Sequence, residues 1–268
     1  EVMITCDILG PGLANSGLGN QMFCIASTLG LACENNDSAT FPQLAMPPFD
    51  FYGRTIFHKL PRVSVDTTST YHEKPYTSTI YNKIPYTENL CIRGHFQSYK
   101  YFHEYRENIL DMFCLPEYIS EDIDKRHSGI LENSDSSTSL HVRRGDYLKL
   151  AGHYHMLDMS YYQKAVDMQD SEIVVVFSDD IEWCKKEISF DSKKVIFVEE
   201  EIDVVDMYLM SKMKNNIIAN STFSWWAAYM NTDKNKKVIG PKDWFGPTRT
   251  DSNEVETADL MPEDWTRI

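Results

Sequence analysis

The sequence has no long hydrophobic run, no closely spaced pair of cysteines and no excess of positive charge. Because no stretch of about 18 apolar residues occurs, a membrane-spanning helix is not expected. The six cysteines lack C-x-x-C spacing, which favours buried thiols over a zinc site or a disulfide framework. With 40 acidic and 26 basic residues the net charge is −14, which argues against a nucleic-acid-binding surface.

The beginning of the chain also lacks the pattern of a secretory signal peptide. Glu1-Val2-Met3-Ile4 has no basic segment followed by an apolar one. Together with the cysteine spacing, this pattern predicts a cytoplasmic protein, either free or held peripherally at the inner membrane face.

The second half of the chain alternates short apolar segments with segments of helical periodicity. Strands are expected at Ser139–Val142, Ile173–Phe177, Val195–Val198, Asn216–Ala219 and Val238–Gly240, with helices at Tyr161–Met168, Ile181–Glu187, Val204–Met213 and Trp225–Met230. This alternation predicts an α/β fold with a doubly wound parallel sheet.

The first half is harder to assign. Residues 2–8 are expected to form a strand, followed by a glycine-rich loop and a helix from Asn20 to Ala32. Further helices are expected at Phe102–Phe113 and Glu121–Leu131. The polar segment Glu132–Thr138 resembles a linker, which predicts domains at 1–137 and 138–250 and a tail at 251–268.

The segment His141-Val142-Arg143-Arg144-Gly145-Asp146-Tyr147 places two arginines where a strand ends. Adjacent guanidinium groups repel each other, so an anion is expected between them. Arginine binds phosphate oxygens two at a time, and glycine allows a tight turn. The sequence therefore predicts a phosphate or diphosphate site here.

Two more polar segments follow apolar strands, and in parallel sheets ligands bind at such strand ends. Asp179 and Asp180 either cap the next helix or accept hydrogen bonds from a base or ribose. Asn220-Ser221-Thr222-Phe223-Ser224 either caps a helix or holds phosphate oxygens with its hydroxyl and N–H groups. No strand ends in D-x-D and no histidine pair has ligand spacing, so no metal is expected.

A third feature is Gly17-Leu18-Gly19-Asn20-Gln21-Met22-Phe23. The full G-x-G-x-x-G pattern is absent because position 22 is methionine, so the evidence for dinucleotide binding is weak. The segment is either a tight entry into a helix or a place where the Asn20 and Gln21 amides face a cleft.

Taken in order, these segments, with Phe177-Ser178-Asp179-Asp180 and the continuation into Trp225-Trp226, resemble the α-1,2-fucosyltransferases of glycosyltransferase family 11. The resemblance implies a GT-B fold with two Rossmann-like domains facing across a cleft. It also implies GDP-fucose as co-substrate, a galactose-containing oligosaccharide or glycolipid acceptor, and no metal cofactor. By this likeness Arg143 holds the diphosphate, and Asn20 and Gln21 face the donor from the N-terminal, acceptor-side domain. The loop Leu9–Ser16 is longer than the family pattern.

The expected reaction is inverting transfer of L-fucose from GDP-β-L-fucose to the 2-hydroxyl of a galactoside. The alternatives are a non-catalytic nucleotide- or glycan-binding protein and a fucosyltransferase of another linkage. The catalytic candidates are Arg143, His141 and Asp146, and the donor-binding candidates are Asn20, Gln21, Arg144, Asp179, Asn220, Ser221, Thr222 and Ser224.

The identity of the catalytic base is left open by the sequence. We expect Asp146 to pair with Arg144 and His141 to be protonated beside the diphosphate, so both have electrostatic roles. The base is then an acid of the first half or the leaving diphosphate itself.

Overall fold

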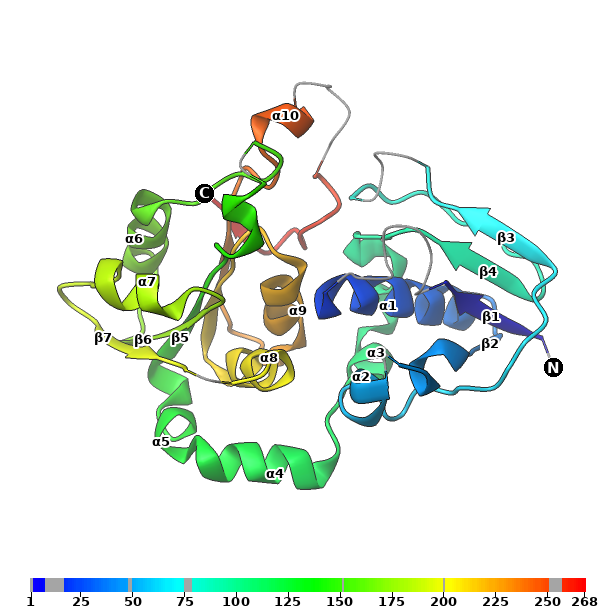
Figure 1. Cartoon of the computed structure of the whole chain (residues 1–268), viewed down its shortest axis with the longest axis horizontal. Coiled ribbons are helices and arrows are strands. Elements are labelled where there is room, and N and C mark those ends of the chain that lie inside the picture. Colours follow the sequence, from blue (N-terminus) through cyan, green and yellow to red (C-terminus); the bar gives the residue numbers. More distant parts are fainter. Residues whose placement is uncertain are drawn as a thin grey trace. The chain divides into compact units, whose positions relative to one another are not determined.

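The computed structural model describes residues 2–7, 17–47, 50–74, 79–150, 152–199, 201–250 and 257–268 (Figure 1). Contacts divide the chain into unit 1, Glu1–Asp122 with Val255–Pro262, and unit 2, Ile123–Glu254 with Glu263–Ile268. Each unit contains a parallel sheet with helices, which confirms the expected α/β class. The loop Leu9–Ser16 lies outside the described residues.

The segment expected to be a linker lies inside unit 2. Residues Ser134–Ser136 form a short 3-10 helix, and Ser137 already begins the central strand β5. The Ser136 and Ser137 hydroxyls both donate to the Asn133 carbonyl. These polar side chains therefore close a local turn, and the division of the chain falls ten or more residues earlier than the composition suggested.

The sheet of unit 2 has six parallel strands in the order β10-β9-β8-β5-β6-β7. The strands are β5 (Ser137–Val142), β6 (Ile173–Ser178), β7 (Lys194–Phe197), β8 (Asn215–Ile217), β9 (Val238–Gly240) and β10 (Thr266–Arg267). Counted along the chain from β5, the spatial order is 3-2-1-4-5-6, the order of dinucleotide-binding sheets. The direction of winding therefore reverses between β5 and β8, and ligands bind at the strand ends beside such a reversal.

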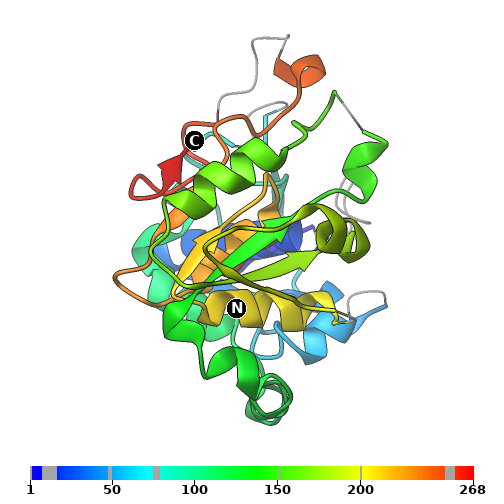
Figure 2. The same ribbon diagram turned by 90° about the vertical axis from the view of Figure 1, so that its left-hand side faces the viewer.

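Helices cover both faces of this sheet (Figures 1 and 2). On one face α6 (Met159–Asp167) and α7 (Ile181–Glu187) pack in a core that includes Leu140 and Val142. On the other face lie α8 (Asp203–Lys212) and α9 (Thr222–Met230). Because side chains alternate along a strand, His141 points toward α9, where its ring contacts Phe223.

Unit 1 has a four-stranded parallel sheet in the order β2-β1-β4-β3. The strands are β1 (Met3–Cys6), β2 (Ser38–Ala39), β3 (Ser69–His72) and β4 (Leu90–Arg93). The expected helix at 20–32 is α1 (Leu18–Glu34), and a Cβ at Gly30 would lie 2.2 Å from the Tyr101 carbonyl oxygen. Glycine is therefore required for this close helix contact.

The remaining helices depart more from the sequence expectations. They are α2 (Asp50–Arg54), α3 (Arg106–Met112), α4 (Glu117–Arg126), α5 (Ser128–Leu131) and α10 (Pro247–Thr250), with 3-10 turns at Pro42–Ala45, Tyr99–Tyr101, His103–Tyr105 and Asp146–Leu148. The helix expected at 102–113 is thus largely the shorter α3, and the one expected at 121–131 is two helices. None of the helices within the described residues is long and apolar enough to cross a membrane.

A buried amide network fixes β8 beside β5. The Asn216 side-chain amide donates to the Ser139 hydroxyl and to the Met210 carbonyl, both at 2.8 Å. Its oxygen accepts from the Asn231 amide at 2.8 Å, and Asn231 also donates to the Met213 carbonyl. Asn216 is 1% exposed. If its side chain were removed, its partners would remain buried and could not hydrogen-bond to water instead.

Asn216→Ala should therefore lower the free energy of unfolding by about 2–4 kcal/mol, because several buried polar groups lose their partners. Urea denaturation followed by far-UV circular dichroism measures this. Asn235→Ala, in an exposed turn, is the matched control and should change stability by less than about 0.5 kcal/mol. Equal stability of the two variants would show that the network contributes nothing.

Glu73 directly follows β3 and accepts hydrogen bonds from the backbone N–H groups of His95 and Phe96, at 2.7 and 2.9 Å. Burial outweighs these bonds and raises its pKa to about 7. A carboxyl whose pKa is higher in the native state binds its proton more tightly there than in the unfolded chain. Its contribution to stability is therefore complete below about pH 4.5 and is lost as the pH rises through about 7.

Relative to Glu73→Gln, the wild-type protein should thus lose on the order of 2 kcal/mol of unfolding free energy between pH 5 and pH 8. Denaturant titrations of both proteins across this range measure the difference. Glu107 is at an exposed position of α3, so the unfolding free energy of Glu107→Gln should change with pH in the same way as that of the wild type. A constant difference between wild type and Glu73→Gln at all pH values would contradict the shifted pKa.

Candidate functional site

The loops that follow β5, β6 and β8 meet at the point where the sheet of unit 2 reverses its winding. The Arg144 backbone N–H donates to Asp179 Oδ1 at 2.9 Å, which joins the β5 loop to the β6 loop. The Tyr147 hydroxyl donates to the Asn220 carbonyl at 2.8 Å, which joins the β5 loop to the β8 loop. The three polar segments picked out in the sequence are therefore brought together in the fold.

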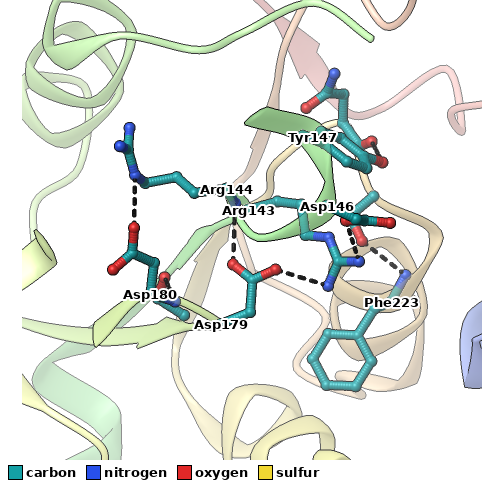
Figure 3. A network of polar contacts seen from close by, with 10 residues as sticks. Arg143, Arg144, Asp146, Tyr147, Asp179, Asp180 and Phe223 are labelled. Atoms are coloured by element: carbon teal, nitrogen blue, oxygen red, sulfur yellow. Dashed lines mark hydrogen bonds and ion pairs between the residues drawn. The ribbon is translucent and has the colours of Figure 1, made fainter. Parts of the chain in front are cut away.

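Arg143 lies between two carboxylates (Figure 3). Its Nη2 is 2.7 Å from Asp146 Oδ1 and its Nη1 is 3.0 Å from Asp179 Oδ2. The guanidinium also lies 5.3 Å from the centre of the Tyr147 ring. With 31% of the side chain exposed, the guanidinium is oriented by these contacts and still reached by solvent.

Arg144 points in the opposite direction from Arg143, as expected from strand alternation (Figure 3). Its Nε donates to Asp180 Oδ2 at 3.1 Å, and its guanidinium stacks 3.8 Å above the Trp183 ring. The expected Arg144–Asp146 pair is therefore wrong, because Asp146 is bound to Arg143. Arg144 instead ties the β5 loop to the start of α7, which Asp180 caps.

Gly145 permits the closest contact in the site. A Cβ at this position would lie 2.4 Å from Asp179 Oδ2, so any side chain here would displace the carboxylate that holds Arg143. The glycine of the arginine segment is thus required by packing against Asp179.

The β8 loop uses its polar side chains mainly to shape the turn. The buried Asn220 amide donates to the carbonyls of His155 and Trp244, both at 2.8 Å. Ser221 caps α9 by accepting from the Phe223 N–H, and Ser224 accepts from the Ala219 N–H. Of the two readings of this loop, helix capping is the one that the contacts support, and Thr222 begins α9. Direct contacts of these residues with the nucleotide sugar stay a prediction.

His141 is only 4% exposed, and its Nδ1 has no hydrogen-bond partner among the residues that the structure describes. Burial, with Arg143 nearby, lowers its pKa to about 3. The imidazole is therefore neutral near pH 7 in this structure and packs beneath the site against Phe223, and its protonation beside a bound diphosphate stays a prediction.

Two residues of the site carried too little sequence signal to be chosen as candidates. Tyr147 bridges two loops through its hydroxyl, and its ring stacks on Tyr154 with 4.0 Å between ring centres. Trp183 provides the surface on which Arg144 lies. Tyr147 closes the arginine segment, and Trp183 lies one turn into α7, so proximity in sequence was the available signal.

Asn20 and Gln21 belong to unit 1, whereas the arginine cluster belongs to unit 2. Asn20 Oδ1 accepts from the Gln97 amide at 2.9 Å, which joins the start of α1 to the segment after β4, and Gln21 is buried. Across the described residues, no group of three or more His, Cys, Asp or Glu side chains is arranged to hold a metal ion. Guanidinium groups such as that of Arg143 bind the oxygens of anions two at a time.

Comparisons with known proteins identify relatives of this chain. The glycosyl transferase family 11 model matches residues 13–267. An O-antigen biosynthesis glycosyltransferase, WbnK of Escherichia coli, is 39% identical over 61% of this chain and 58% of its own length. An α-1,2-colitosyltransferase of Escherichia coli is 30% identical over 94% of this chain and 96% of its own length. A galactoside 2-α-L-fucosyltransferase of Bos taurus is 28% identical over 81% of this chain and 63% of its own length.

The fold is shared with solved fucosyltransferases. The crystal structure of NodZ from Bradyrhizobium matches with a TM-score of 0.56 at 14% identity, over 85% of this chain and 92% of that chain. The two parallel-sheet units are thus of the GT-B type expected from the sequence. Since the family model spans nearly the whole chain, this protein is a glycosyltransferase and belongs to glycosyltransferase family 11.

Proposed function

We propose that this enzyme transfers L-fucose from GDP-β-L-fucose to the 2-hydroxyl of a galactoside, with inversion at the anomeric carbon. Arg143 supports the proposal most directly, because it stands at the reversal of the sheet, beside the start of α9. The names of relatives favour the same chemistry, since one is a galactoside 2-α-L-fucosyltransferase and a fold neighbour was soaked with GDP-fucose. A galactose-containing oligosaccharide or glycolipid fits the O-antigen relative as acceptor.

In this proposal unit 2 holds the donor. The diphosphate lies against the Arg143 guanidinium and the first N–H groups of α9, where the helix dipole also favours negative charge. Asp179 and Asp180 accept hydrogen bonds from the base or ribose through lone pairs that the arginines leave free. Unit 1 is assigned to the acceptor, and contacts of Asn20 and Gln21 with the nucleotide-sugar donor stay a prediction.

The chemical step needs charge stabilisation on the leaving group and a proton acceptor. As the bond to fucose breaks, negative charge grows on the diphosphate, and each guanidinium or N–H contact contributes about 2–4 kcal/mol to its stabilisation. The buried neutral His141 is not suited to take the acceptor proton. The proton goes to a carboxylate, either Asp146 or an acid of unit 1, or to the diphosphate itself.

The colitosyltransferase relative favours GDP-colitose as a second candidate donor, because its match covers both chains almost fully. Colitose differs from fucose by the absence of the 3-hydroxyl. A site that hydrogen-bonds this hydroxyl rejects the sugar that lacks it, so the two donors are readily distinguished by their kcat/KM values.

Transfer assays with both donors test the proposal. With GDP-fucose, lactose and an excess of EDTA, we expect a fucosylated product whose new bond, assigned by NMR, is α-1,2 to galactose. Preference for GDP-colitose would select the second candidate, and another linkage would overturn the acceptor assignment. Loss of activity in EDTA that one particular divalent ion restores would contradict metal independence.

Arg143→Lys should lower kcat/KM at least a hundredfold, on the order of 3 kcal/mol, because lysine keeps the charge but loses the two-pronged contact. Steady-state kinetics measure the change, and a thermal melt confirms folding. Arg54→Lys, on the surface of unit 1, is the control and should behave as wild type. Near-normal activity of a folded Arg143→Lys would remove Arg143 from the reaction.

A further inference from the structure

The arginine cluster of unit 2 is not positively charged as a whole. Two arginines face three aspartates, Asp146, Asp179 and Asp180, so the formal charge of the five side chains is −1. A diphosphate entering this site would meet a guanidinium whose charge is already balanced on two sides. Tight binding therefore requires that one carboxylate give up its place on Arg143.

Asp179 is held firmly. Besides the 3.0 Å contact with Arg143, its other oxygen accepts the Arg144 backbone N–H at 2.9 Å. The backbone at Gly145 lies directly against it, and only 26% of the side chain is exposed. Moving Asp179 would break several contacts and open a gap beside the loop.

Asp146 is held much more weakly. Its side chain is 56% exposed, and its carboxylate has a single described partner, Arg143 Nη2 at 2.7 Å. Exposed ion pairs of this kind contribute little to stability, because water and salt screen them. A hydrogen-bonded arginine–phosphate contact is charge-assisted and commonly bidentate, so it can replace such a pair.

We propose that Asp146 is an exchangeable counter-ion of Arg143: its carboxylate leaves the guanidinium when a diphosphate arrives and returns when the diphosphate departs. Asp179 remains in place and keeps Arg143 oriented in both states. The inference rests on the proposed function, since it takes the diphosphate of a nucleotide sugar as the incoming anion.

The exchange would act most strongly on the product. A free nucleoside diphosphate ends in a phosphate monoester with a second pKa near 6, so it carries up to one more negative charge than the nucleotide sugar. Attraction to Arg143 alone would hold the product more tightly than the donor. A carboxylate that competes for the same guanidinium weakens the binding of both and so favours product release.

The test compares Asp146→Asn with Asp179→Asn by isothermal titration calorimetry with GDP. Asp146→Asn should lower the Kd of GDP about two- to tenfold, because the competing charge is gone while the shape is kept. Asp179→Asn should raise the Kd, because Arg143 loses its fixed partner. Asp167→Asn, at the end of α6, removes one acidic charge away from the cluster and should leave the Kd unchanged.

Inorganic pyrophosphate serves as a second probe, independent of the base and sugar. If Asp146→Asn binds both probes no more tightly than wild type, the exchange is overturned, whatever the donor. If wild type binds pyrophosphate but not GDP, and Asp146→Asn strengthens pyrophosphate binding, the exchange stands and the nucleotide of the proposed function is wrong. Binding of neither probe by wild type overturns both. Thermal melts establish that each variant is folded, which the exposure of Asp146 favours.

Discussion

The position of β5 at the centre of the unit 2 sheet is the constraint on which the site depends. β5 pairs in parallel with β6 on one side and with β8 on the other, so the chain leaves all three strands at the same edge. The buried amides of Asn216 and Asn231 hold β8 in this place. Without that pairing Arg143, Asp179 and Ser221 would be three isolated polar residues.

The arginines of the site are paired with carboxylates. Each arginine has a carboxylate partner, and the difference between the partners lies in how firmly they are held. Asp180 and Asp179 are built into the β6–α7 turn, whereas Asp146 is half-exposed on a short 3-10 turn. A protein with a net charge of −14 thus contains an arginine cluster in which acidic side chains orient the cations.

Much of the fold was predictable because its signals are local. The run Ile173–Phe177 and the helix Ile181–Glu187 were placed within a residue, since continuous apolar runs and helical periodicity do not depend on distant contacts. The linker prediction was wrong because serine and asparagine side chains also close tight turns. The loop-rich part of unit 1 has no such periodicity, and its short strands depend on pairing across the sheet.

The sequence by itself determined which residues reach the site: an arginine pair, an aspartate pair and a capped helix start each follow an apolar strand, and strand ends converge in any parallel sheet. Only the tertiary structure decided their partners. It paired Asp146 with Arg143, stacked Arg144 on Trp183 and buried His141 as a neutral ring. The physical reason is that burial and the direction of a side chain depend on strand order and on neighbouring loops, which no local pattern contains.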